Sequence, residues 1–193
     1  MATETLRPNA AGDSTDFTSQ VPASGSHWDK VDEASADDDT TYIRADPNGG
    51  AFSGRDLFNL PAPSSSGQIN SVTMYIRAIT NIWGDCRGQL RTYSINYSFP
   101  GAAWRPAAWT TINNTWITNP NTGNPWTWQE IEDLQIGASG FAGAGQWVQV
   151  TQAYIVIDYT PGWSSGDVSG VPVSQAAKIN GVALASIVRV NGV

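Results

Sequence analysis

Residues 69–79 read Ile69-Asn-Ser-Val-Thr-Met-Tyr-Ile-Arg-Ala-Ile79, and this stretch decides the fold class. Its residues alternate between the two faces of an extended chain. One face carries Val72, Met74, Ile76 and Ala78, and the other carries Thr73, Tyr75, Arg77 and Ile79. A period of two is the pattern of a strand that buries one face. The stretch therefore predicts a β-strand that lies against a core.

Strand-like composition returns along the rest of the chain. β-Branched and aromatic residues favour further strands over residues 40–45, 56–60, 89–97, 109–117 and 147–159, and residues 134–138 lead into another. The segments between them are rich in Gly, Pro and Asn, which do not continue a sheet ladder. Short strands separated by turns predict an all-β protein, an antiparallel β-sandwich of the jelly-roll type.

One short helix is expected within residues 125–134. Thr127 is suited to cap its first turn, because Glu130 follows three residues later and completes a capping box. Ile131 and Leu134 are one helical step apart, which fits a helix of about two turns.

Changes in composition divide the chain into four segments. Residues 1–26 are polar and lack a helical period, so they are expected to form an extended N-terminal arm. The β-sandwich body is expected over residues 27–160. Residues 161–170 have the Gly- and Ser-rich composition of a linker, and residues 171–193 are expected to form a C-terminal β-hairpin that serves as an assembly arm.

The C-terminal segment contains Ile179-Asn-Gly-Val182, and Val190-Asn-Gly-Val193 repeats that pattern. Asn-Gly between β-branched residues is a strong hairpin signal, because a type I′ turn needs two residues that tolerate a positive φ. The hairpin either stabilises its own chain or binds a neighbouring subunit by strand addition. The residues expected to bind a partner are Ile179, Asn180, Gly181, Val182, Leu184, Ile187 and Val190.

Charge and hydropathy exclude several classes of function. Lys and Arg number 10 against 17 Asp and Glu, for a net charge of −7, so a phosphate-binding basic face and a nucleic-acid partner are not expected. Neither a secretory signal nor an apolar run of membrane length is visible, so no membrane partner is expected. Cys86 stands alone, which leaves the fold to rest on packing alone.

The sequence offers no convincing catalytic set, and the protein is expected not to be an enzyme. His27 is the single histidine and has no recognisable nucleophile motif beside it. Cys86 lies between turn residues and is expected to be a buried or reduced thiol. Glu130, Glu132 and Asp133 resemble a set of glycosidase carboxylates, but a short capped helix places them better as exposed, solubilising side chains.

The acidic run that ends with Asp37, Asp38 and Asp39 has enough carboxylate oxygens for Ca²⁺. It lacks the spacing of an EF-hand loop, so the alternative is a solvated loop whose carboxylates cap turns and pair with Lys30, Arg44 or Arg55. No cofactor other than such a Ca²⁺ ion is expected.

Five tryptophans crowd one part of the sequence, namely Trp104, Trp109, Trp116, Trp126 and Trp128. Aromatic rings bind the C–H faces of sugars, so a carbohydrate-binding platform is one interpretation. Burial of these rings as core and loop anchors is the other interpretation.

Several stretches resemble uncharacterised structural proteins of tailed phages and metagenomic viruses. The resemblance rests on Glu4-Thr-Leu-Arg-Pro-Asn9, Asp37-Asp-Asp-Thr-Thr-Tyr42, Trp126-Thr-Trp128 and the tail Lys178-Ile-Asn-Gly-Val-Ala183. It implies a virion component and carries over no catalytic or ligand-binding residue.

The resemblance and the lack of a catalytic set together favour a non-enzymatic virion structural protein. The expected role is a decoration protein on the capsid exterior, or a tail or fibre component, made in the host cytoplasm. Its expected partners are copies of itself and the major capsid or tail proteins. The alternatives are a carbohydrate-binding module or adhesin that binds surface glycans, and a subunit of an extracellular filament assembled by strand donation.

Overall fold

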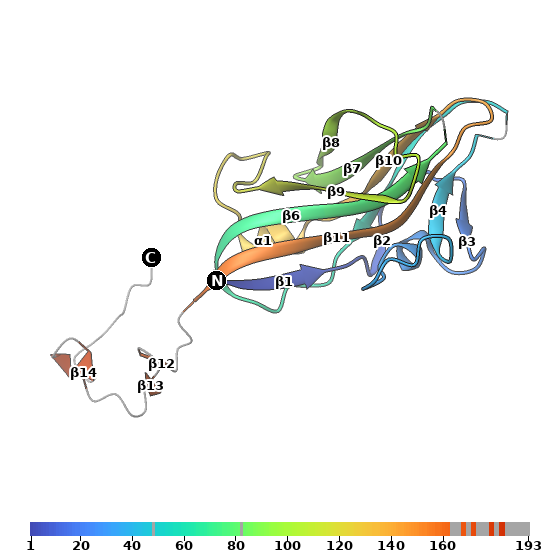
Figure 1. Ribbon diagram of the computed structural model, residues 1–193. Coiled ribbons are helices and arrows are strands. Elements are labelled where there is room, and N and C mark those ends of the chain that lie inside the picture. The colour runs from blue at the N-terminus through green and yellow to red at the C-terminus, as the bar shows by residue number, and fades with distance from the viewer. Residues whose placement is uncertain are drawn as a thin grey trace.

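The computed structural model describes residues 1–47, 49–81 and 83–162, and four two-residue strands at 167–168, 171–172, 178–179 and 182–183. Within these residues the chain forms two large antiparallel sheets that pack face to face, and two small two-stranded ones (Figure 1). One short α-helix accompanies them. The predicted all-β sandwich of the jelly-roll type is therefore confirmed.

The first sheet has six strands. They are β1 (Ala2–Leu6), β3 (Ser19–Val21), β4 (Tyr42–Ala45), β6 (Gly67–Thr80), β9 (Thr110–Trp116) and β11 (Val148–Pro161). The order is β3-β4-β11-β6-β9, and β1 pairs with β11 beyond the end of β4. The long strand β11 thus lies between β6 on one side and both β4 and β1 on the other.

The second sheet has five strands. They are β2 (Ala10–Thr15), β5 (Phe52–Asn59), β7 (Asp85–Thr92), β8 (Ile95–Trp104) and β10 (Gln135–Ala142). The order is β2-β5-β10-β7-β8, so β10 is the central strand. Its two neighbours, β5 and β7, pair with it along almost its whole length.

The core lies between the two sheets and follows the alternation in the sequence. Val72, Met74, Ile76 and Ala78 of β6 are all buried in it, as predicted. The second sheet contributes the buried side chains Phe58, Leu90 and Ile136, among others. Burial of these apolar side chains at about 25 cal/mol per Å² is the main stabilising contribution to the fold.

The predicted N-terminal arm is not separate from the body. Residues 1–26 contain β1, β2 and β3, which pair with β11, β5 and β4 respectively. The segment looked like an unstructured arm because most of its side chains face outward and are polar. Its inward residues, Leu6 and Phe17, are buried, and backbone pairing to the body satisfies much of its main chain. A short 3₁₀ helix, η1 (His27–Lys30), follows it.

The single strand predicted over residues 89–97 is wrong, because the chain turns back at its middle. β7 and β8 form a hairpin in which Thr92 pairs with Ile95. The two residues between them, Tyr93 and Ser94, have φ values of 50° and 63°. Positive φ at both positions marks a type I′ turn, which Asn-Gly normally signals and Tyr-Ser does not.

The predicted helix and its cap are confirmed. Helix α1 (Trp128–Glu132) begins after Thr127, whose side chain accepts a hydrogen bond from the backbone N–H of Glu130. The Glu130 carboxylate accepts one in return from the backbone N–H of Thr127, at 2.8 Å. Ile131 is buried in the core, and the Trp128 indole donates to the carbonyl of Gly67 at 2.8 Å, which ties the helix to the start of β6.

The C-terminal segment contains two small antiparallel ladders. β12 (Asp167–Val168) pairs with β13 (Val171–Pro172), so part of the predicted linker 161–170 is a strand. β14 (Lys178–Ile179) pairs with β15 (Val182–Ala183), with Ile179 opposite Val182, which confirms that the residues on either side of the first Asn-Gly pair as antiparallel strands. The other predicted partner-binding residues lie outside the described part of the chain, namely Asn180, Gly181, Leu184, Ile187 and Val190.

Candidate functional site

A polar cleft lies across the outer face of the five-stranded sheet, centred on β10. We call it the β10 cleft. It has a volume of about 570 Å³, which is within the range of small-molecule binding sites. Its lining comes from four strands and consists of Ser53, Arg55, Asp85, Arg87, Gln89, Asn96, Ser98, Ser139, Gly140 and Phe141.

Strand register places these side chains in rows. Ser139 of β10 lies directly opposite Arg55 of β5 and Arg87 of β7. Residues directly opposite in antiparallel strands project from the same face, so the row reads Arg-Ser-Arg across three strands. Phe141 is opposite Ser53 and Asp85 in the next row. Ser139 and Gly140 of β10 lie at the floor of the cleft, and Arg55 and Arg87 line it on either side.

Gln89 organises the hydroxyl groups of the floor. Its side chain is only 2% exposed, and its amide nitrogen donates to Ser98 Oγ at 2.8 Å and to Ser139 Oγ at 2.7 Å. Ser98 Oγ donates back to Gln89 Oε1 at 3.1 Å. Both serine oxygens are therefore held in place before any ligand arrives. The Ser139 hydroxyl hydrogen has no acceptor among the described residues and is available to a ligand.

The charges of the cleft are unequally neutralised. The Arg87 guanidinium pairs with Asp85 Oδ2 at 3.1 Å, and the other oxygen of Asp85 accepts from the backbone N–H of Trp104 at 2.7 Å. Arg55 lines the cleft without an ion-pair partner among the described residues. The cleft thus carries one net positive charge on a protein whose overall charge is −7.

A second pocket, of about 470 Å³, lies beside β2, β3 and η1. It is lined by Trp28 and Phe58 among others, and by His27, whose Nδ1 lies 2.5 Å from Asp56 Oδ2. Asp56 is fully buried, and its Oδ1 accepts from the backbone N–H groups of Asp16 and Phe17. His27 is therefore part of a buried polar network that anchors the N-terminal strands to β5.

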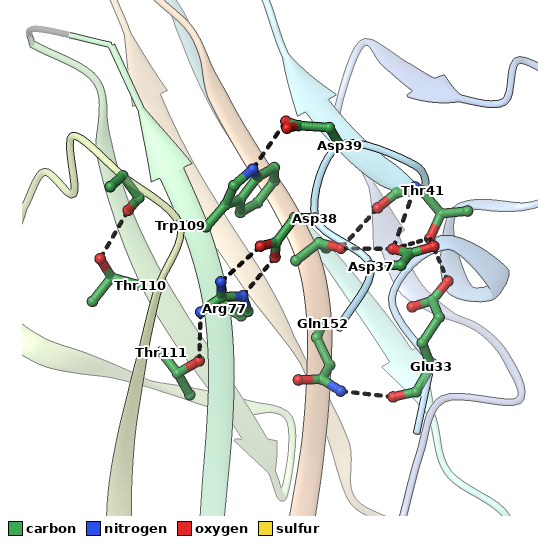
Figure 2. Close-up of polar contacts among 12 residues, drawn as sticks. Glu33, Asp37, Asp38, Asp39, Thr41, Arg77, Trp109, Thr110, Thr111 and Gln152 are labelled. Carbon is green, nitrogen blue, oxygen red and sulfur yellow. Dashed lines mark hydrogen bonds and ion pairs between the residues drawn. The ribbon is translucent and has the colours of Figure 1, made fainter. Parts of the chain in front are cut away.

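The acidic loop, which we define as residues 37–39, does not gather its carboxylates around one point (Figure 2). Asp37 accepts from the Thr41 hydroxyl, Asp38 pairs with Arg77 at 2.6 Å, and Asp39 accepts from the Trp109 indole at 3.0 Å. Among the described residues no group of three or more His, Cys, Asp or Glu side chains is arranged to hold a metal. The predicted Ca²⁺ site at Asp37, Asp38 and Asp39 is not formed, because each carboxylate has a different partner.

Two carboxylates near this loop have shifted pKa values of opposite sign. Hydrogen bonds from the Arg77 guanidinium hold the pKa of Asp38 below its ordinary value. Burial raises the pKa of Glu33, and the neighbouring charges of Asp37 and Asp32 act in the same direction. Glu33 Oε1 lies 2.5 Å from the Thr41 hydroxyl oxygen, whose single hydrogen Glu33 and Asp37 share, while Glu33 Oε2 is buried without a hydrogen-bond partner among the described residues.

Replacing Glu33 with glutamine is expected to stabilise the protein at pH 7 and to have no effect near pH 4. A raised folded-state pKa stabilises the fold below the unfolded value, about 4.5, and this contribution is lost as the pH rises through the folded value. The neutral amide avoids that loss. We expect Glu33→Gln to raise the Tm by a few degrees at pH 7. Thermal unfolding at both pH values measures it.

The matched control for this prediction is Glu132→Gln, since Glu132 is exposed on α1. It is expected to leave the Tm unchanged at both pH values. An equal gain from Glu33→Gln at pH 4 and pH 7 would contradict the titration of Glu33 as its cause.

The five clustered tryptophans contact the core or a neighbouring loop. Trp126 is only 4% exposed, and Trp104, Trp116 and Trp128 pack partly buried against the core. Trp109 is held beside the acidic loop by its bond to Asp39. These contacts favour the interpretation of the rings as core and loop anchors.

The other residues considered for catalysis are buried, make hydrogen bonds that support the fold, or are exposed on α1. Cys86 is fully buried, and burial raises the pKa of its thiol, so the reactive thiolate is disfavoured. Glu130 completes the capping box of α1 and also accepts from the Tyr93 hydroxyl at 3.1 Å. Asp133 accepts from the Gln129 side chain at 3.2 Å, and Glu132 is exposed.

None of the residues that line the β10 cleft was singled out from the sequence as part of a binding site. The signal that could have found them is the alternation of polar residues in β5, β7 and β10. Arg87 and Gln89, for example, are two positions apart on β7 and share its outer face. That alternation is also what a solvated sheet face shows, and only strand pairing reveals that three such strands are neighbours.

Among the described residues, no helix has the length and apolar composition needed to cross a membrane.

Comparisons with known proteins give structural matches alone. No family model and no curated protein matches the chain. A structure of TmCBM61 in complex with beta-1,4-galactotriose is similar at 13% identity and a TM-score of 0.39, covering 62% of this chain and 72% of that one. CBM35 from Cellvibrio japonicus Abf62 is similar at 12% identity and a TM-score of 0.40, covering 82% and 95%. A CBM4 structure is similar at 10% identity and a TM-score of 0.32, covering 65% and 85%. At these values the matches assign the chain to no family and identify no ligand.

Proposed function

We propose that this protein is a non-catalytic glycan-binding protein whose ligand lies in the β10 cleft. The observation that carries the proposal is the row Arg55-Ser139-Arg87 over a floor organised by Gln89. Such a site offers many hydrogen-bonding groups and no assembled nucleophile or acid–base pair. Recognition without chemistry is the function that fits it.

Sugar hydroxyl groups need both donors and acceptors at short spacing. The cleft supplies them as serine hydroxyls, the amide of Asn96 and the guanidinium groups of Arg55 and Arg87. Because Gln89 already fixes Ser98 and Ser139, less conformational entropy is lost when a ligand binds to them.

Phe141 gives the cleft an apolar contact. Its side chain is 51% exposed, and it lies in the row next to Ser139 on the same face of the sheet. An exposed ring at the edge of a polar cleft can pack against the C–H face of a sugar. Polar and aromatic contacts are thus available to the same ligand.

Filling the floor of the cleft is expected to abolish glycan binding. Ser139→Tyr places a large side chain in the middle of the arginine row, where it covers the floor. The outer face has room for it, so the protein should stay folded and lose about 1 kcal/mol with one hydrogen bond from Gln89. Affinity electrophoresis against a broad panel of soluble polysaccharides, followed by calorimetry on those retained, measures binding.

The matched control is Thr115→Tyr, because Thr115 is exposed on the other sheet and its hydroxyl also makes one side-chain hydrogen bond, to Thr73. This variant should bind as the original protein does. Retention of binding by a folded Ser139→Tyr variant, or the absence of any bound glycan for the original protein, would sink the proposal.

As a second candidate we propose a virion structural role, as a capsid-exterior decoration protein or a tail or fibre component. The observation in its favour is the pair of ladders β12–β13 and β14–β15, each only two residues long. Two-stranded ladders of this size are marginal in water, so contact with another protein would stabilise them. This role is compatible with glycan binding, since the two use different parts of the chain.

Deleting residues 171–193 tests the second candidate. The strands of both large sheets end at Pro161, so the body is expected to keep its Tm within about 1 °C. The full chain is expected to self-associate in analytical ultracentrifugation, and the truncated chain is expected to stay monomeric. If the full chain and the truncated chain sediment as the same species, and the truncated chain is still incorporated into particles, the assembly role of this segment is wrong.

A further inference from the structure

Arg55 differs from every other Lys or Arg side chain that the structure describes. Five of the others form ion pairs, namely Lys30, Arg44, Arg77, Arg87 and Arg91. Arg7 and Arg105 lie over the rings of Tyr154 and Trp83. Among the described residues, the Arg55 guanidinium alone has no ion pair, side-chain hydrogen bond or aromatic ring as a partner. It is half-buried in the wall of the β10 cleft.

The positions of the two cleft arginines give them different roles. They stand on either side of Ser139, two interstrand spacings apart, which is roughly 9–10 Å. Asp85 neutralises Arg87 and is itself fixed by the N–H of Trp104. Arg87 can donate hydrogen bonds to a ligand but adds no net charge, whereas Arg55 adds a full positive charge.

We infer that the glycan bound in the β10 cleft is acidic, and that the carboxylate of a uronic acid residue pairs with Arg55 across from the Ser139 hydroxyl. This inference rests on the proposed function. A planar guanidinium matches a carboxylate with two parallel hydrogen bonds, which fixes both the position and the orientation of that sugar. The neutral groups of the floor then bind the remaining hydroxyls.

A free inorganic anion is a poor match for this site. One accessible guanidinium, without a second unneutralised cation or a backbone amide cluster, holds a small anion weakly in water. The neutral donors and acceptors of Gln89, Ser98 and Ser139 contribute only when the anion is attached to a polyhydroxylated body. The positive charge of Arg55 therefore favours acidic glycans over neutral ones, and it does not form a separate site for small anions.

The test compares each acidic polymer with its own neutral form. Polygalacturonate, alginate and glucuronoxylan are each measured beside the same polymer after carboxyl reduction, with the full chain. We expect at least one acidic polymer to bind about tenfold or more tightly than its reduced form. Arg55→Gln should remove this difference between the acidic polymer and its reduced form, and Arg55→Lys should restore part of it.

Arg105→Gln is the matched control, because Arg105 also has no ion pair but lies on the Trp83 ring. It should keep the preference for the acidic polymer. Equal affinity for acidic and reduced polymers would overturn this inference and leave glycan binding in place, whereas failure to bind either would overturn both. A preference that survives Arg55→Gln, or equal binding of dextran sulfate, would also overturn the assignment of Arg55 to a uronate.

Discussion

Gly137→Ala is expected to lower the Tm by roughly 10 °C, equivalent to a loss of about 3 kcal/mol in the free energy of unfolding. Gly137 lies in the centre of β10, opposite Leu57 of β5 and Gln89 of β7. A Cβ atom there would collide with the carbonyl oxygen of Asp56 and lie 2.8 Å from its carbonyl carbon. Those atoms are backbone, so β5 would have to move away from β10.

The matched control for Gly137 is on the same strand. A Cβ atom on Gly140 would lie 3.4 Å from the Ala45 side chain and 3.4 Å from the Phe17 ring, which are ordinary contacts. Gly140→Ala should therefore keep the stability within about 1 kcal/mol. Thermal and urea unfolding of both variants measure the difference. Equal stability of the two variants would show that the β5–β10 spacing does not depend on a glycine at position 137.

Asp56→Ala is expected to destabilise the protein by about 3–5 kcal/mol, the cost of breaking a buried charged network. The Asp56 carboxylate is fully buried and accepts from His27 Nδ1 and from the backbone N–H groups of Asp16 and Phe17, at 2.5, 2.7 and 2.9 Å. Alanine leaves all three donors without their acceptor. Unpaired buried N–H groups cost about 1–3 kcal/mol each, and the connection between β2 and β3 would detach from β5 first.

Two variants separate this effect from the general loss of an acidic side chain. Asp56→Asn retains an oxygen for the two backbone N–H groups and should cost less than Asp56→Ala. Asp133→Ala removes an exposed carboxylate after α1 and should cost less than about 0.5 kcal/mol. Urea unfolding gives the free energies. Similar losses for Asp56→Ala and Asp133→Ala would mean that the Asp56 network does not anchor the N-terminal strands.

Local patterns in the sequence determined the fold class and several elements. The alternation over residues 69–79 specified a strand with Val72 and Met74 buried, and β6 has them so. Thr127 and Glu130 specified a capped helix, because a capping box is built from residues three positions apart. These features depend on near neighbours in the chain, so the residues alone contain the information.

Tertiary structure decided what the sequence could not. The N-terminal residues became strands because β11, β5 and β4 offered partners for their backbone groups, which hydropathy does not reveal. The three carboxylates of the acidic loop went to separate partners, including Arg77, which is 39 residues from Asp38. The β10 cleft exists because Arg55, Arg87 and Ser139 come from strands far apart in the sequence and meet only in register. Long-range strand pairing determines which polar faces lie side by side, and the sequence of one strand does not specify which strands pair with it.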